Sequence, residues 1–124
     1  MKVLIVESQQ DLANLWGAHL GRLGHSVDLV QTADEAIRTA SSTTYDAVIV
    51  NLILQKGSAL GLADYLRVQQ PDTNIVFVTD TTFFSDGSLF AHSGNVRAFV
   101  TSHTRPDDLA AIVEHYGRQA ALAR

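Results

Sequence analysis

The chain has 124 residues and is 46% hydrophobic, which is enough for the core of one domain without disulfides or a structural metal, so we expect a single domain over residues 1–124. The absence of cysteine excludes a disulfide framework and a thiolate metal site. The 13 acidic and 9 basic residues are scattered and give a net charge of -4, which argues against direct nucleic-acid binding by this domain.

The first apolar run of the chain is short. It extends from Val3 to Val6 and ends at Glu7. A run of this length is too short for the hydrophobic region of a signal peptide and for a membrane-spanning helix. We therefore expect a cytoplasmic protein without membrane contact, and the same run predicts a buried first strand.

Helices are expected after the first and second strands, because a capping-box spacing follows each of them. Ser8 and Asp11 have this spacing ahead of an amphipathic stripe. The stripe consists of Leu12, Leu15, Trp16, His19, Leu20 and Leu23. A short second strand over residues 27–30 leads to the same spacing at Thr32 and Glu35, which predicts a second helix.

The third strand is expected to deliver a functional side chain. Its apolar run from Ala47 to Val50 ends abruptly in the amide of Asn51. A strand buried on both faces is apolar throughout, and function in a parallel sheet lies at the carboxyl ends of the strands. A third helix up to about Gln70, stopped by Pro71, and a fourth strand over residues 74–78 are expected next.

The last part of the chain contains the weakest and the clearest helix signals. The segment 79–94 predicts a helix that Ser85, Gly87 and Ser88 weaken. A fifth strand over residues 97–101 and a helix with Pro106 in its first turn follow. Strands that alternate with helices predict an α/β fold with a doubly wound, five-stranded parallel sheet flanked by five helices.

This pattern resembles the receiver domain of two-component response regulators, the CheY-like fold, which is flavodoxin-like with strand order 2-1-3-4-5. The resemblance covers the whole chain, from Lys2–Val6 through Tyr45–Val50 to the helix start at Pro106–Leu109. In that family an acidic pair follows the first strand, and a phosphoryl-accepting Asp ends the third. A Ser or Thr ends the fourth strand, and a Lys follows the fifth.

Most of these family residues are replaced in this chain. The positions of the acidic pair hold Glu7 and Ser8, and the acceptor position holds Asn51. The hydroxyl position holds Thr79 and is followed by Asp80, and the position of the lysine holds Ser102. The amide of Asn51 has no anionic oxygen to act as a nucleophile. Glu7 is the sole carboxylate among the matched ligand positions, so magnesium affinity should fall steeply. The resemblance therefore implies a degenerate phosphorylation pocket with no catalytic residue, no metal site and no cofactor.

Several of these positions also have an ordinary structural explanation. Ser8 is expected to cap the first helix, because Asp11 completes its capping box. Phe99 matches the switch-like aromatic position of the family, but without a phosphoryl trigger it is expected to be a fixed packing residue. In receivers the fourth helix, fifth strand and fifth helix contact partners. The candidate interaction face of this chain holds Phe83, Phe84, Phe90 and Tyr116.

The favoured hypothesis is a non-enzymatic, phosphorylation-independent receiver that binds a signalling protein or a second copy of itself. One alternative is a small-molecule sensor, in which Glu7 and Asp80 would favour a cationic or hydroxyl-rich ligand. Another is the receiver of a longer regulator with a DNA-binding output. A flavodoxin-like cofactor binder fits less well, because residues 7–12 lack a Gly- and Thr-rich phosphate cradle.

Overall fold

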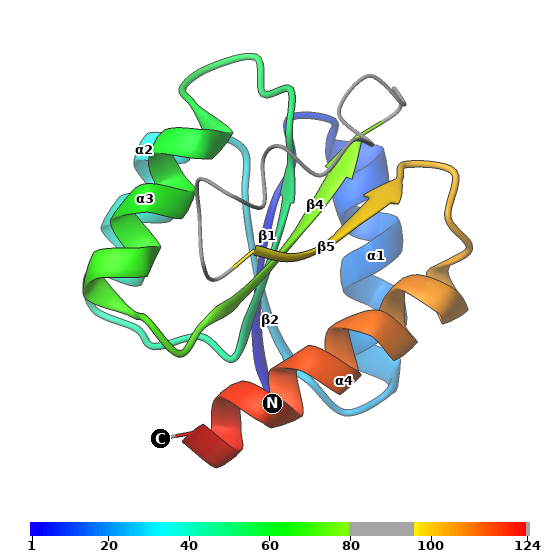
Figure 1. Cartoon of the computed structure of the whole chain (residues 1–124). Coiled ribbons are helices and arrows are strands. Elements are labelled where there is room, and N and C mark those ends of the chain that lie inside the picture. The colour runs from blue at the N-terminus through cyan, green and yellow to red at the C-terminus, as the bar shows by residue number, and fades with distance from the viewer. Residues whose placement is uncertain (80–95, 124) are drawn as a thin grey trace.

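The computed structural model describes residues 1–79 and 96–123, which form five strands and four helices (Figure 1). In chain order these are β1 (Lys2–Val6), α1 (Gln10–Arg22), β2 (Ser26–Val30), α2 (Ala33–Ala40), β3 (Ala47–Asn51), α3 (Ala59–Gln69), β4 (Asn74–Thr79), β5 (Val96–Thr101) and α4 (Pro106–Ala123). The helix expected over residues 79–94 falls outside the described residues, except that Thr79 is the last residue of β4. Four of the five expected helices are therefore described.

The strands form one parallel sheet in the order β2-β1-β3-β4-β5. This order confirms the expected doubly wound fold. The three central strands carry the apolar runs and are buried almost throughout, because helices cover both faces of the sheet. The order reverses between β1 and β3, so the carboxyl ends of these two strands border the crevice in which such sheets place their sites.

The helices divide into two layers (Figure 1). Helices α2 and α3 cover one face of the sheet, where Leu4 and Phe77 belong to the core. Helices α1 and α4 cover the other face, where Ile5, Trp16 and Val113 are buried. Within residues 1–79 and 96–123, no helix combines the length and apolarity needed to cross a bilayer.

Helix α1 buries a narrower stripe than its sequence predicts. Ala13, Trp16 and Leu20 are buried, whereas Leu15 and Leu23 are each 50% exposed. Adjacent residues of a helix point about 100° apart, so Leu15 is turned away from the direction in which Trp16 meets the sheet. The amphipathic stripe expected from the sequence therefore includes two leucines, Leu15 and Leu23, that the core does not bury.

The amino end of the sheet is closed by the side chain of Gln70, just after α3. Its Nε2 donates to the carbonyl oxygens of Ala40 at 2.7 Å and Thr43 at 2.8 Å. Its Oε1 accepts from the backbone N–H of Tyr45 at 3.0 Å and lies 2.9 Å from Thr73 Oγ1. One amide therefore joins α2, α3 and the strands at their amino ends, with all of its polar atoms paired.

The phenol of Tyr45 belongs to the same end of the sheet. Its ring is fully buried, and its hydroxyl donates to Asp28 Oδ2 at 2.6 Å. Burial first, and then the hydrogen bond and the negative charge of Asp28, raise the pKa of Tyr45 well above its ordinary value of 10.0. The phenol therefore keeps its proton in the folded protein.

Candidate functional site

The site is built on Glu7 and Asn51, which lie at the carboxyl ends of β1 and β3. The two strands pair in register up to Val6 and Val50, so the side chains that follow meet. Asn51 Nδ2 donates to Glu7 Oε1 at 2.8 Å, and the backbone N–H of Gln9 donates to Glu7 Oε2 at 3.1 Å. The carboxylate of Glu7 is only 1% exposed and is held by neutral donors.

The amide of Asn51 is fixed from both sides. While its nitrogen donates to Glu7, its Oδ1 accepts from the backbone N–H of Ile53 at 2.9 Å. Turning the amide over would place an oxygen against the carboxylate and an N–H against an N–H, so the orientation follows from the network. Asn51 therefore acts as a connector between a buried acid and the loop after β3.

Ser8 does not cap α1, so this prediction is wrong. The cap position is Gln9, which makes no side-chain capping bond, and the helix begins at Gln10. Ser8 lies one residue outside the cap, where its hydroxyl is used elsewhere. Its Oγ accepts from the backbone N–H of Gln55 at 3.0 Å and donates to the carbonyl of Gln31 at 3.4 Å.

The loop over residues 52–58 is thereby tied to the site and to α2. Gly57 has φ +90, and a Cβ at this position would lie 2.6 Å from Ala33 Cβ, so a larger residue would be strained and would clash. The carbonyl of Lys56 also accepts from the backbone N–H of Ala33 at 3.5 Å. Ser8, Asn51 and the start of α2 together hold this loop in place.

A hollow of about 240 Å³ lies over the Glu7 and Asn51 pair. It is lined by Glu7, Ser8, Gln9, Asn51, Ile53, Leu54 and Gln55. A second hollow of about 320 Å³ shares Ser8 and Gln55 with the first. Sequence reasoning missed Gln9, Ile53, Leu54 and Gln55; the available signal was that they directly follow β1 and β3, whose loops border the crevice.

Two other predicted pocket residues lie at the neighbouring strand ends. Thr79 ends β4 and is buried, and its carbonyl accepts from the backbone N–H of Ser102 at 2.9 Å, just after β5. Neither residue lines the hollow over Glu7. Asp80 lies outside the described residues. The structure therefore brings Glu7, Ser8 and Asn51 into one cavity and places Thr79 and Ser102 beside each other at the same edge.

Magnesium is the metal that the family resemblance implies, and the donor set does not fit it. Among the described residues, Glu7 is the one carboxylate that lines the hollow, and both of its oxygens already accept hydrogen bonds. Magnesium favours carboxylate ligands in octahedral geometry. Among the residues that the structure describes, no group of three or more His, Asp or Glu could hold a metal ion.

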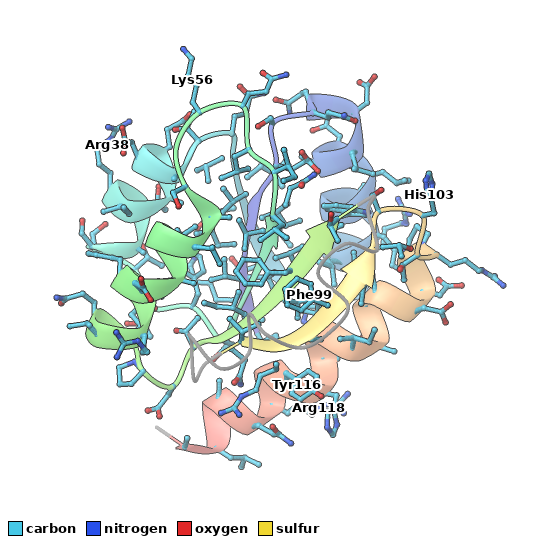
Figure 2. The ribbon with its side chains drawn as sticks, turned by 45° about the horizontal axis from the view of Figure 1, so that its top comes forward. Arg38, Lys56, Phe99, His103, Tyr116 and Arg118 are labelled. Atoms are coloured by element: carbon cyan, nitrogen blue, oxygen red, sulfur yellow. The ribbon has the colours of Figure 1, made fainter. Side chains whose placement is uncertain are left out.

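The aromatic positions are described in part (Figure 2). Phe83, Phe84 and Phe90 lie outside the described residues. Phe99 projects from β5 and packs on Phe77, with ring centroids 5.2 Å apart and planes at 38°. Tyr116 lies on α4, half-buried, with its ring edge-on to His115 at 4.9 Å.

Comparison with known proteins gives a family match. The model of the response regulator receiver domain matches residues 3–114. The transcriptional regulatory protein DltR of Streptococcus agalactiae is 28% identical over 126 residues, covering 100% of this chain and 55% of that protein. The two-component response regulator PhoP of Pseudomonas aeruginosa is 35% identical over 79 residues, covering 64% of this chain and 35% of PhoP. The chain spans about half the length of DltR.

Solved structures match the fold. NtrX from Brucella abortus in complex with ATP superposes with a TM-score of 0.88 at 21% identity, covering 99% of this chain and 28% of NtrX. The response regulator TrrA from Thermotoga maritima in complex with Mg(2+)-BeF has a TM-score of 0.81 at 21% identity, covering 93% of this chain and 97% of TrrA. At these identities the likeness concerns the fold alone.

Proposed function

Since the chain belongs to the response regulator receiver domain family, we propose that it is an atypical receiver that works without aspartyl phosphorylation. In this proposal it is a non-enzymatic module of two-component signal transduction that acts by binding another protein. The partner is a signalling protein or a second copy of the chain. The proposal rests on what Asn51 does at the acceptor position.

The carrying observation is the hydrogen bond from Asn51 Nδ2 to Glu7 Oε1, at 2.8 Å. A phosphoacceptor must present an anionic oxygen as the nucleophile. Asn51 instead turns an N–H donor toward the acidic residue, and its oxygen is occupied by the backbone of Ile53. The side chain at the acceptor position is thus engaged in holding the site together.

The neighbouring replacements support the same conclusion. The hydroxyl of Ser8 hydrogen-bonds to the backbone of Gln55 and Gln31. Because this hydroxyl is neutral, it adds no charge that would hold a divalent cation. Ser102 stands where the family has a lysine to pair with the phosphoryl group, and a neutral hydroxyl cannot supply that positive charge. The three replacements weaken nucleophile, metal and charge stabilisation independently.

The proposed contact surface is the side of the domain that carries β5 and α4. Tyr116 is its described aromatic residue, and Phe83, Phe84 and Phe90 are assigned to it by the family resemblance. Phe99 packs on the core residue Phe77, which favours a fixed ring over a switch. A surface that needs no trigger would be available to the partner at all times.

This function is tested by adding magnesium and beryllofluoride, a mimic of the phosphoryl group, while recording ¹H–¹⁵N spectra. The wild-type spectrum is expected to stay unchanged. The matched control is the triple variant Ser8→Asp/Asn51→Asp/Ser102→Lys, which restores the family residues and should respond at the ends of β1 and β3. A wild-type response at β5 and α4 would contradict the proposal.

A second candidate comes from the relatives. DltR, matched over 100% of this chain, carries the name of a transcriptional regulatory protein, and the match covers 55% of its length. A receiver that controls a DNA-binding output in the same polypeptide is therefore the alternative. Mass measurement of the native gene product decides between a product of this size and one about twice as long.

A further inference from the structure

Glu7 is a buried acid that has no basic partner among the described residues. It is 1% exposed, and its oxygens accept from two neutral donors, Asn51 Nδ2 at 2.8 Å and the Gln9 N–H at 3.1 Å. The ion pairs found among residues 1–79 and 96–123 involve other acids. The segment 80–95 contains no Lys or Arg, and its one basic side chain is His92. Buried carboxyl groups are normally paired with a basic group, so a Glu7 side chain that is held by neutral donors alone is unusual.

The hollow next to the carboxyl group of Glu7 is lined by both polar and aliphatic side chains. A carboxylate offers about four acceptor positions, of which two are filled here. The hollow of about 240 Å³ beside Glu7 is lined by the amide side chains of Gln9 and Gln55, which add neutral oxygen acceptors, and by the aliphatic side chains of Ile53 and Leu54. Ile53 is 61% exposed, so its apolar surface is free to be covered.

We infer that this hollow binds a primary alkylammonium group. The N–H donors of the ammonium reach the free acceptor positions of Glu7 and the amide oxygens around it, and the aliphatic stem lies against Ile53 and Leu54. The ammonium comes from a free amine or from a lysine side chain of a partner protein. This inference gives the altered pocket a ligand and stands whether or not the domain is phosphorylated.

The geometry favours an ammonium over other cations. A guanidinium prefers both oxygens of a carboxylate in parallel, but Asn51 and Gln9 already hold one oxygen of Glu7 each. Magnesium requires more charged oxygen ligands than one carboxylate provides. An ammonium is a compact charge with three donors that needs only one carboxylate oxygen at a time.

The test is a titration of ¹⁵N-labelled full chain with n-butylammonium chloride. The side-chain NH₂ of Asn51 and the backbone N–H of Gln9 both donate to Glu7, so their signals report directly on the carboxylate. Both signals are expected to shift with a dissociation constant in the millimolar range. At equal ionic strength, n-butanol, tetramethylammonium and magnesium should leave them in place.

Variants test separately the charge of Glu7 and the contact of Ile53 with the aliphatic stem of the ligand. Glu7→Gln should weaken n-butylammonium binding at least about tenfold, because the charged acceptor is lost. Glu35→Gln, at a carboxylate lining the neighbouring hollow, is the matched control and should bind as wild type. Ile53→Ser, at an exposed position that keeps the charge and the fold, should weaken binding about threefold.

The outcomes are distinct. Unchanged Asn51 and Gln9 signals at saturating n-butylammonium, equal binding by wild type and Glu7→Gln, or equal shifts with tetramethylammonium would each overturn the inference. Nα-acetyl-lysine amide separates the two sources. Binding at least as tight as n-butylammonium supports a lysine of a partner protein, and weaker binding supports a free amine. None of these results depends on whether residue 51 accepts a phosphoryl group.

Discussion

The polar side chains at the two ends of the sheet differ in how fully they are hydrogen-bonded. At the amino end, the side chain of Gln70 fills its hydrogen bonds with Ala40, Thr43, Tyr45 and Thr73. At the carboxyl end, Glu7 is more deeply buried than Gln70, but its carboxyl group has only two neutral donors and a hollow beside it. The first arrangement suits a structural joint, and the second suits a site that something else can enter.

Two side chains at the carboxyl end hold the loop after β3. Asn51 and Ser8 bind the backbone of Ile53 and Gln55, so the replaced residues have acquired a structural use. Stability is expected to depend most on the amino end, and chemistry on the carboxyl end. The following substitutions test this division, beginning with the largest expected effect.

Gln70→Ala should cost about 3 kcal/mol of unfolding free energy, because it leaves three partly buried backbone groups of the amino end without their side-chain partner. Urea denaturation measures this loss. Gln69→Ala, at the exposed neighbouring position, is the matched control and should change stability by less than about 0.5 kcal/mol. Equal effects of the two variants would show that the amino-end joint is unimportant.

Asn51→Asp should lower the free energy of unfolding by about 2 kcal/mol at neutral pH, because it places a second carboxylate beside Glu7 and removes the N–H that donates to Glu7. Acidification, which neutralises one of the two acids, and magnesium should both recover stability, as thermal melts would show. Asn14→Asp, at an exposed position on α1, is the control for the change of charge. A variant as stable as wild type, with no response to magnesium, would contradict the close pairing of residues 7 and 51.

Tyr45→Phe should lower the free energy of unfolding by about 1 kcal/mol at neutral pH and change how this free energy depends on pH above pH 10. The raised pKa means that above pH 10 the unfolded chain loses the phenol proton while the folded chain keeps it. Wild type should therefore lose up to about 1.4 kcal/mol per pH unit from this group as the pH rises above 10. Urea denaturation across this pH range should show that the unfolding free energy falls less steeply with pH for the variant than for wild type. Equal slopes for the two proteins would contradict the raised pKa of Tyr45.

Ser8→Ala should have the smallest effect on stability, below about 1 kcal/mol, because its hydrogen bonds lie near the surface. Hydrogen exchange gives the sharper readout. The amide of Gln55 should exchange about tenfold faster, since its acceptor is gone. Ser41→Ala, at an exposed hydroxyl after α2, is the control. An unchanged rate at Gln55 would mean that Gly57 and Asn51 alone hold the loop.

Local patterns predicted the elements better than the contacts between them. Thr32 caps α2 as expected, with its Oγ1 accepting from the Glu35 N–H at 3.1 Å. The same spacing at Ser8 fails, because the hydroxyl of Ser8 is engaged by Gln55, 47 residues away. A pattern of adjacent residues carries no information about such a distant competitor.

The apolar runs predicted the three central strands, since burial on both faces requires continuous apolar sequence, and the alternation of strands with helices predicted the doubly wound sheet. The position of Asn51 at the end of β3 was predicted for the same reason. Its hydrogen bonds to Glu7 and Ile53 were not, because they depend on strand register and on the course of a loop. The joint made by Gln70 left no local signal either, because its partners come from α2 and from the residues that precede β3 and β4.

The central claim, that the carboxyl end no longer accepts a phosphoryl group, is tested most directly by intact-mass spectrometry after incubation with a small-molecule phosphodonor and magnesium. The wild-type mass should remain unchanged, Asn51→Asp should show weak labelling at most, and Ser8→Asp/Asn51→Asp/Ser102→Lys should gain one phosphoryl group. A phosphoryl adduct on wild-type residue 51 would contradict the account.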